Sequence, residues 1–141
     1  MKKIILSITF LLIAITGFSQ TVIGKWKTID DETGKAKSIV EIYEKSGKIY
    51  GRILEILEEE NRNRKCDLCT GIEKDKPILG MVIIKGLTKD GDEYSGGKIL
   101  DPKNGKQYKC YITLDGKDKL KVRGYIGISL LGRTQTWARV K

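Results

Sequence analysis

Apolar and polar residues alternate along several short segments of this chain. In residues 119–126, for example, Leu120, Val122 and Ile126 fall on one face of an extended strand, and the positions between them are basic or aromatic. Residues 106–114 show the same period of two. Such a period with one polar face indicates an antiparallel sheet that buries its other face.

Turn-forming residues separate these segments from one another. Asn104 and Gly105, for instance, supply the positive backbone dihedrals that a tight hairpin needs. The expected strands are residues 24–29, 37–43, 48–57, 79–87, 93–100, 106–114, 119–126 and 133–140. Consecutive hairpins need no crossover, and closure removes both edges of a sheet. The pattern therefore predicts an all-β fold, a small antiparallel up-and-down β-barrel of about eight strands.

The N-terminus carries a pattern typical of export. Two lysines follow Met1, residues 4–15 are almost entirely apolar, and Gly17 and Ser19 place small residues where a signal peptidase reads. The apolar run is shorter than the roughly 20 residues of a transmembrane helix, and no comparable run follows it. We therefore expect a signal peptide at residues 1–19, one domain at 20–141, no membrane span, and a periplasmic or secreted protein.

Composition and charge exclude several kinds of catalytic and binding site. The formal charge of +9 comes from lysines scattered over turns and alternate strand positions, which favours a solvated, edge-protecting surface over a nucleic-acid site. The chain has no histidine, which excludes Ser-His-Asp and Cys-His catalysis and every metal site that needs imidazole. We expect no cofactor, no metal and no nucleic-acid partner, and the pattern leaves the oligomeric state open.

Residues 58–77 are the one long irregular segment, rich in charge and containing Cys66 and Cys69. In an exported protein, two neighbouring cysteines favour a disulfide, which would pin this loop in one shape. A redox-active pair and a metal site are the alternatives. Cys110 lies on the apolar face of its strand, where we expect a buried thiol.

The last strand carries the most informative polar residues. Arg133, Gln135 and Trp137 share one face, and we expect Trp137 to point inward, which brings polar groups into the interior. A buried arginine needs a partner. Asp101 and Glu55 are the candidate acidic partners for Arg133, and the alternative partner is an anionic ligand. An outward Trp137 would instead leave a plain aliphatic core.

Two further segments carry candidate residues. Gly24 and Trp26 open the first strand, where the indole can fill one end of a barrel beneath an arginine of the last strand. On the third strand, Tyr50 and Arg52 share one face and Ile49 and Ile53 share the other. The alternation does not decide which of these two faces is inside.

Taken together, these motifs resemble a known exported bacterial family, the domain of unknown function 2147. The residues that carry the resemblance are Gly24 and Trp26, 49–53, the Cys-x-x-Cys pair, Gly80 and Met81, 97–106, 120–127 and 131–137. The resemblance spans essentially the whole chain after the signal peptide. It implies a lipocalin-like β-barrel and no established activity, so it transfers no catalytic residues.

From these residues we predict a non-catalytic binding protein of the cell envelope, for a small, partly apolar ligand with an anionic group. The aromatic residues would supply contact area, and the arginines would meet a carboxylate or phosphate. The candidate ligand-binding residues are Trp26, Tyr50, Arg52, Asp101, Arg133, Gln135 and Trp137. One alternative is a structural or protein-interaction module with a solid core. The other is an enzyme, for which no pair of acid–base residues has diagnostic spacing.

Overall fold

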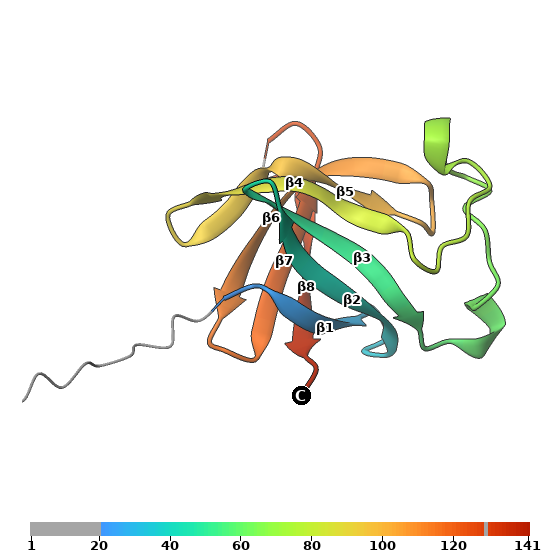
Figure 1. Ribbon diagram of the computed structural model, residues 1–141, viewed down its shortest axis with the longest axis horizontal. Helices are drawn as coiled ribbons and strands as arrows, with labels where there is room; N and C mark the ends of the chain where they lie inside the picture. Colours follow the sequence, from blue (N-terminus) through green and yellow to red (C-terminus); the bar gives the residue numbers. More distant parts are fainter. Residues whose placement is uncertain (1–20, 129) are drawn as a thin grey trace, which may run out of the picture.

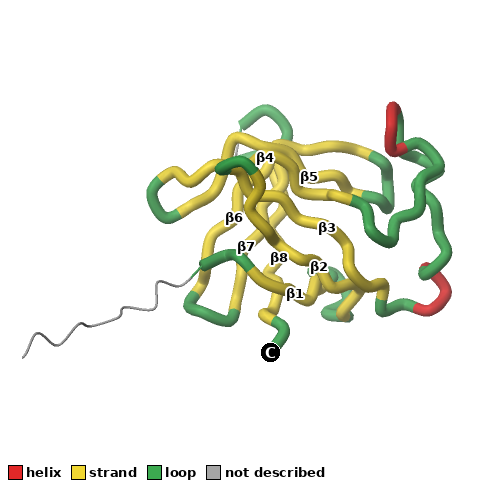
Figure 2. The backbone as a smooth tube through the Cα atoms, in the orientation of Figure 1, coloured by secondary structure: helices red, strands yellow, loops and turns green. Residues whose placement is uncertain are grey.

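The computed structural model describes residues 21–128 and 130–141, so the predicted signal peptide at 1–19 lies outside the described residues. Eight strands form one closed barrel, in which each strand pairs antiparallel with the next and β1 pairs with β8 (Figure 1; Figure 2). The strands are β1 (Gly24–Ile29), β2 (Ala36–Lys45), β3 (Lys48–Ile56), β4 (Val82–Asp90), β5 (Glu93–Asp101), β6 (Lys106–Asp115), β7 (Lys119–Tyr125) and β8 (Gly132–Arg139). The predicted all-β, up-and-down barrel is confirmed.

The connection between β3 and β4 contains two short turns of 3-10 helix, η1 (Glu59–Asn61) and η2 (Gly71–Glu73). It lies beside the barrel, in green at the right of Figure 1. Among the described residues, no helix has the length and apolar character needed to cross a membrane.

Seven strands match the predicted boundaries to within two residues, and β4 is the exception. The alternation predicts a start at Leu79, whereas β4 begins at Val82. Gly80 has a φ of 85°, and the N–H of Met81 donates to the carbonyl of Ile78 at 3.1 Å, so a turn precedes the strand. Ile78 and Met81 are buried in spite of this, because the turn packs onto the barrel.

A β-bulge changes which face of β3 points inward along the strand. Ile39 of β2 pairs with Glu55, but the next residue, Val40, pairs with Ile53, so Leu54 is an extra residue in β3. Ile53 is buried before the bulge and Ile56 is buried after it, because the extra residue shifts the alternation by one. Bulges of this kind bend a strand and so help a sheet to close.

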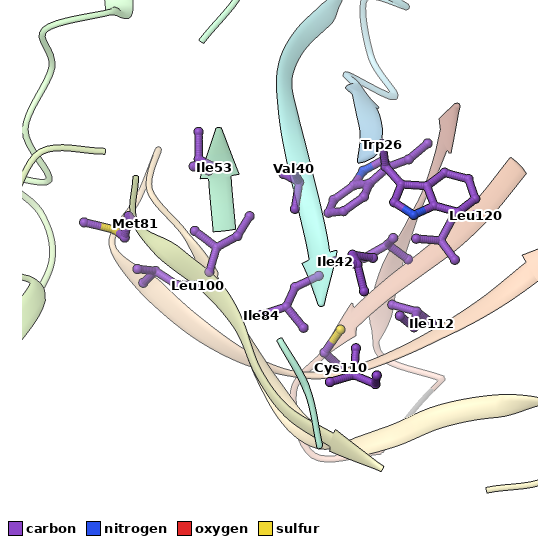
Figure 3. Close-up of a cluster of buried hydrophobic side chains, with 14 of the residues drawn as sticks. Trp26, Val40, Ile42, Ile53, Met81, Ile84, Leu100, Cys110, Ile112 and Leu120 are labelled. Carbon is purple, nitrogen blue, oxygen red and sulfur yellow. The ribbon is translucent and has the colours of Figure 1, made fainter. Parts of the chain in front are cut away.

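The inward faces of all eight strands meet in one apolar core. Figure 3 shows the central side chains pointing toward one another across the barrel. The most deeply buried large residues are Trp26, Ile42, Ile84, Leu87, Ile112 and Leu120. Trp137 is also buried, as the alternation of the last strand predicts.

Trp26 and Arg139 close one end of the barrel. The indole N–H of Trp26 donates to the carbonyl of Val22 at 2.9 Å, and the guanidinium carbon of Arg139 lies 4.3 Å from the ring centroid. The same guanidinium donates to the carbonyls of Thr21 and Lys117, both at 2.7 Å, so it ties the N-terminal segment to the β6–β7 turn. The expected stacking of an arginine on Trp26 is thus made by Arg139.

Cys66 and Cys69 form a disulfide, as expected, and both are buried. The loop that they cross-link packs tightly against the β5–β6 turn. A Cβ atom at Gly105 would lie 2.0 Å from the carbonyl oxygen of Leu68, so only glycine allows this approach. The third cysteine, Cys110, is a buried free thiol in β6, and burial raises its pKa to about 12.

Thiol labelling should report this arrangement. We expect the native protein to incorporate no iodoacetamide at mildly alkaline pH, because the Cys110 thiol is buried and protonated. Unfolding in urea without reduction should expose one reactive thiol, that of Cys110, and unfolding with reduction should expose three. Intact-mass spectrometry counts the adducts. An adduct on Cys110 in the native, unreduced protein would contradict the assignment.

Loss of the Arg139 side chain should weaken the closed end. We expect Arg139→Ala to lower the free energy of unfolding by about 2 kcal/mol, since it removes the cation–π contact and charged hydrogen bonds to backbone carbonyls. Urea denaturation measures the change. Lys141→Ala is the matched control, because Lys141 is exposed and forms only a surface ion pair with Asp118. Equal losses in the two variants would argue against a special role for Arg139.

Candidate functional site

A cavity of about 520 Å³ opens at the barrel end away from Trp26. The β1–β2, β3–β4, β5–β6 and β7–β8 connections surround its mouth, because the strands of a meander reverse direction alternately at its two ends. Much of its wall is apolar and comes from Ile53, Ile56, Ile78, Ile83, Ile99, Leu100, Val122 and Trp137. This wall offers extensive contact area to the apolar part of a small molecule.

Trp137 and Gln135 form the clearest polar feature of the cavity wall. The indole N–H of Trp137 donates to Oε1 of Gln135 at 3.0 Å. An indole can only donate, so this bond fixes which end of the Gln135 amide faces it. Within the described residues, the amide nitrogen of Gln135 makes no hydrogen bond, so it is a donor available to a ligand.

A second polar group lies on β1 and β2. The hydroxyls of Thr28 and Ser38 are 2.7 Å apart, and Lys37 Nζ lies 3.1 Å from a carboxylate oxygen of Asp30. The backbone N–H of Thr33, Lys37 and the backbone N–H of Glu32 together hold the pKa of Asp30 well below its usual range. Asp30 is therefore a fixed negative charge, already neutralised by its own neighbours.

Arg133 links two sides of the cavity mouth. Its guanidinium donates from Nε and Nη2 to the carboxylate of Asp31 and lies 3.3 Å from Glu32. This contact lowers the pKa of Asp31 and raises the pKa of Arg133. Because the native pKa of Asp31 lies below its unfolded value, the pair stabilises the fold above about pH 4, and the contribution is lost as the pH falls through the native pKa.

The expectation that Asp101 or Glu55 partners Arg133 is wrong. In the closed barrel β8 lies beside β1, so the β1–β2 connection brings Asp31 to Arg133. Asp101 lines the cavity from β5, and its carboxylate accepts the backbone N–H of Lys103 at 2.9 Å. Glu55 is exposed beside the bulge of β3.

Four of the seven predicted site residues line the cavity, namely Asp101, Arg133, Gln135 and Trp137. Trp26 lies in the closed end instead. Tyr50 and Arg52 lie outside the barrel, on the face opposite the buried Ile49 and Ile53. There Arg52 forms an ion pair with Glu41 at 2.6 Å, and the ring of Tyr50 stacks on Tyr43 with centroids 5.9 Å apart.

The sequence interpretation missed several residues of the cavity wall. Thr28 and Ser38 occupy inward positions next to apolar ones, and their hydroxyls gave no distinctive signal. Tyr108 belonged to a correctly predicted inward face, and its inward position was the signal that could have found it. Arg64 reaches the cavity from the β3–β4 connection, whose course follows no strand periodicity.

The described residues contain no group of three or more acidic, cysteine or histidine side chains that could hold a metal ion. The arrangement is thus an apolar cavity with a few convergent polar groups inside and paired charges at its mouth.

The barrel is similar to a solved structure, that of protein HP1028 from the human pathogen Helicobacter pylori, which is described as belonging to the lipocalin family. The TM-score is 0.77 and the identity 23%, over 87% of this chain and 85% of that chain, so the two share a lipocalin fold. No curated protein matches the chain significantly. The model of the family described as uncharacterized proteins conserved in bacteria, domain of unknown function 2147, matches residues 24–139, and the chain therefore belongs to that family.

Proposed function

We propose that this protein binds a small, partly apolar molecule in the cavity at the open end of the barrel. The observation that carries the proposal is the combination of an apolar wall with the unused amide donor of Gln135. The volume of about 520 Å³ falls in the range of roughly 300–1,000 Å³ typical of small-molecule sites. The cavity favours this function over a structural module with a solid core.

The polar groups suggest how a ligand is oriented. Its apolar body packs beside Trp137, and a carbonyl or carboxylate oxygen accepts the N–H of Gln135. Arg133 lies at the mouth, where an anionic group of the ligand competes with Asp31 for the guanidinium. Asp101, on the other side of the mouth, meets a donor group of the ligand.

We also propose that the protein acts in the cell envelope after export and removal of residues 1–19. The N-terminal pattern of basic, apolar and small residues supports this, and so does the disulfide, which persists in oxidising compartments.

Two related dyes test the cavity. Anilinonaphthalene sulfonate is anionic, and phenylnaphthylamine is its uncharged analogue. We expect both to bind with enhanced fluorescence, and we expect Gln135→Leu to weaken the sulfonate about tenfold because a hydrogen bond to a charged group is lost. Fluorescence titration gives the dissociation constants.

Thr136→Leu is the matched control, because Thr136 is the exposed neighbour of Gln135 on the outer face of β8. Gly124→Leu should weaken both dyes, since a Cβ at Gly124 has ordinary contacts of 3.4 Å to Ile99 and 3.5 Å to Tyr108, and a longer side chain fills the cavity. Absence of dye binding, or equal effects of the Gln135 and Thr136 variants, would refute the proposal.

Opposite effects are expected at the two ends of the Arg133–Asp31 pair. Asp31→Asn removes the main acidic partner of the guanidinium and should tighten binding of the sulfonate about threefold, whereas Arg133→Ala should weaken it by a similar factor. The lowered pKa of Asp31 keeps the wild-type pair intact at neutral pH. Isothermal calorimetry measures both changes. If the two variants shift the affinity in the same direction, Arg133 does not contact the anionic group.

A further inference from the structure

The β7–β8 loop exposes an unusual concentration of apolar side chains. Of the eight large hydrophobic residues exposed in the described part of the chain, four lie here: Ile126, Ile128, Leu130 and Leu131. No charged residue occurs between Arg123 and Arg133. Backbone hydrogen bonds between Ile126 and Leu131 at 3.2 Å and between Leu131 and Ile128 at 3.0 Å close the loop. Figure 1 shows this loop at the top of the view, in red-orange.

A strip of cations on the outer surface leads to the base of this loop. Lys85 of β4 pairs directly with Lys98 of β5, Lys98 pairs with Lys109 of β6, and Lys109 pairs with Tyr125 at the end of β7. Like charges directly opposite each other destabilise a sheet. Lys85 is neutralised by Glu73, but Lys98 and Lys109 are exposed and form no ion pair within the described residues.

Two tyrosines lie beside the cations on the outer surface. The rings of Tyr111 and Tyr125 are 6.0 Å apart on the outer face of β6 and β7. Tyrosine is enriched where a protein meets the interface between lipid headgroups and acyl chains. The outer surface next to the apolar loop thus combines tyrosine rings with lysine side chains.

We propose that the β7–β8 loop and the adjoining lysine strip dock this protein on an anionic lipid bilayer. The four apolar side chains enter the interface, and Lys98 and Lys109 lie against the lipid phosphates. The charge of the strip argues for this partner. In a two-fold dimer through the same face, the strip would meet its own copy and the lysines would repel one another. A soluble polyanion would match the lysines and leave the apolar loop in water.

A dye on the loop tests the docking without any knowledge of the cavity ligand. Leu130→Cys and Ile72→Cys each receive a polarity-sensitive nitrobenzoxadiazole label. These two positions are matched, because Leu130 is 83% and Ile72 84% exposed. With vesicles of phosphatidylcholine mixed with phosphatidylglycerol, we expect a blue shift of the dye at position 130 and none at position 72. Pure phosphatidylcholine should give no shift at either.

The lysine strip is tested in the protein labelled at position 130. Lys98→Gln with Lys109→Gln should raise the lipid concentration at half-maximal shift about tenfold. Lys25→Gln with Lys27→Gln, which removes the same charge from exposed positions on β1, should leave it unchanged. All variants share the same N-terminal residues, so lipid contacts made there cancel in the comparison.

Equal shifts at positions 130 and 72, or no shift at 130, would overturn the proposal. An unchanged response of the Lys98 and Lys109 variant would do the same. One result would identify a soluble polyanion as the partner instead: the protein binds polyphosphate without a shift of the dye at position 130, and it does not bind the vesicles.

Discussion

Closure of the barrel rests on the junction between its first and last strands. Among the residues that the structure describes, the register there pairs Trp26 with Arg139 and Lys27 with Ala138, so the backbone ladder of this junction is short. The Arg139 guanidinium extends it by contacts with the Trp26 ring and with carbonyls of the N-terminal segment and the β6–β7 turn. One side chain thereby joins three separate parts of the chain at the end that must be sealed.

The sealed end determines where a ligand-sized space can exist. Trp26 and its aliphatic neighbours fill the interior near the junction, so the remaining volume lies toward the other end, where four connections of different length meet. Those connections bring charge to the mouth, and the strands bring apolar side chains to the wall. The same closure places β1 beside β8, which is why an acid of the β1–β2 connection meets Arg133.

Periodicity explains which features could be predicted. A period of two predicted the strands, the inward position of Trp137 and the cavity-facing Gln135, because these depend only on which face of a strand a residue occupies. It failed for Tyr50 and Arg52, since both faces of β3 carry apolar residues and the bulge at Leu54 leaves no sequence signal. It also missed the Asp31–Arg133 pair, which depends on the course of a connection rather than on alternation.

The inward position of Cys110 has a consequence for oxidative folding. A chain with three thiols has three ways to form one disulfide, and two of them involve Cys110. Once β6 is incorporated into the barrel, that thiol is withdrawn from exchange, while Cys66 and Cys69 remain neighbours in a short ring. Where the barrel forms before the cross-link, burial of Cys110 removes the competing nucleophile and favours the Cys66–Cys69 disulfide.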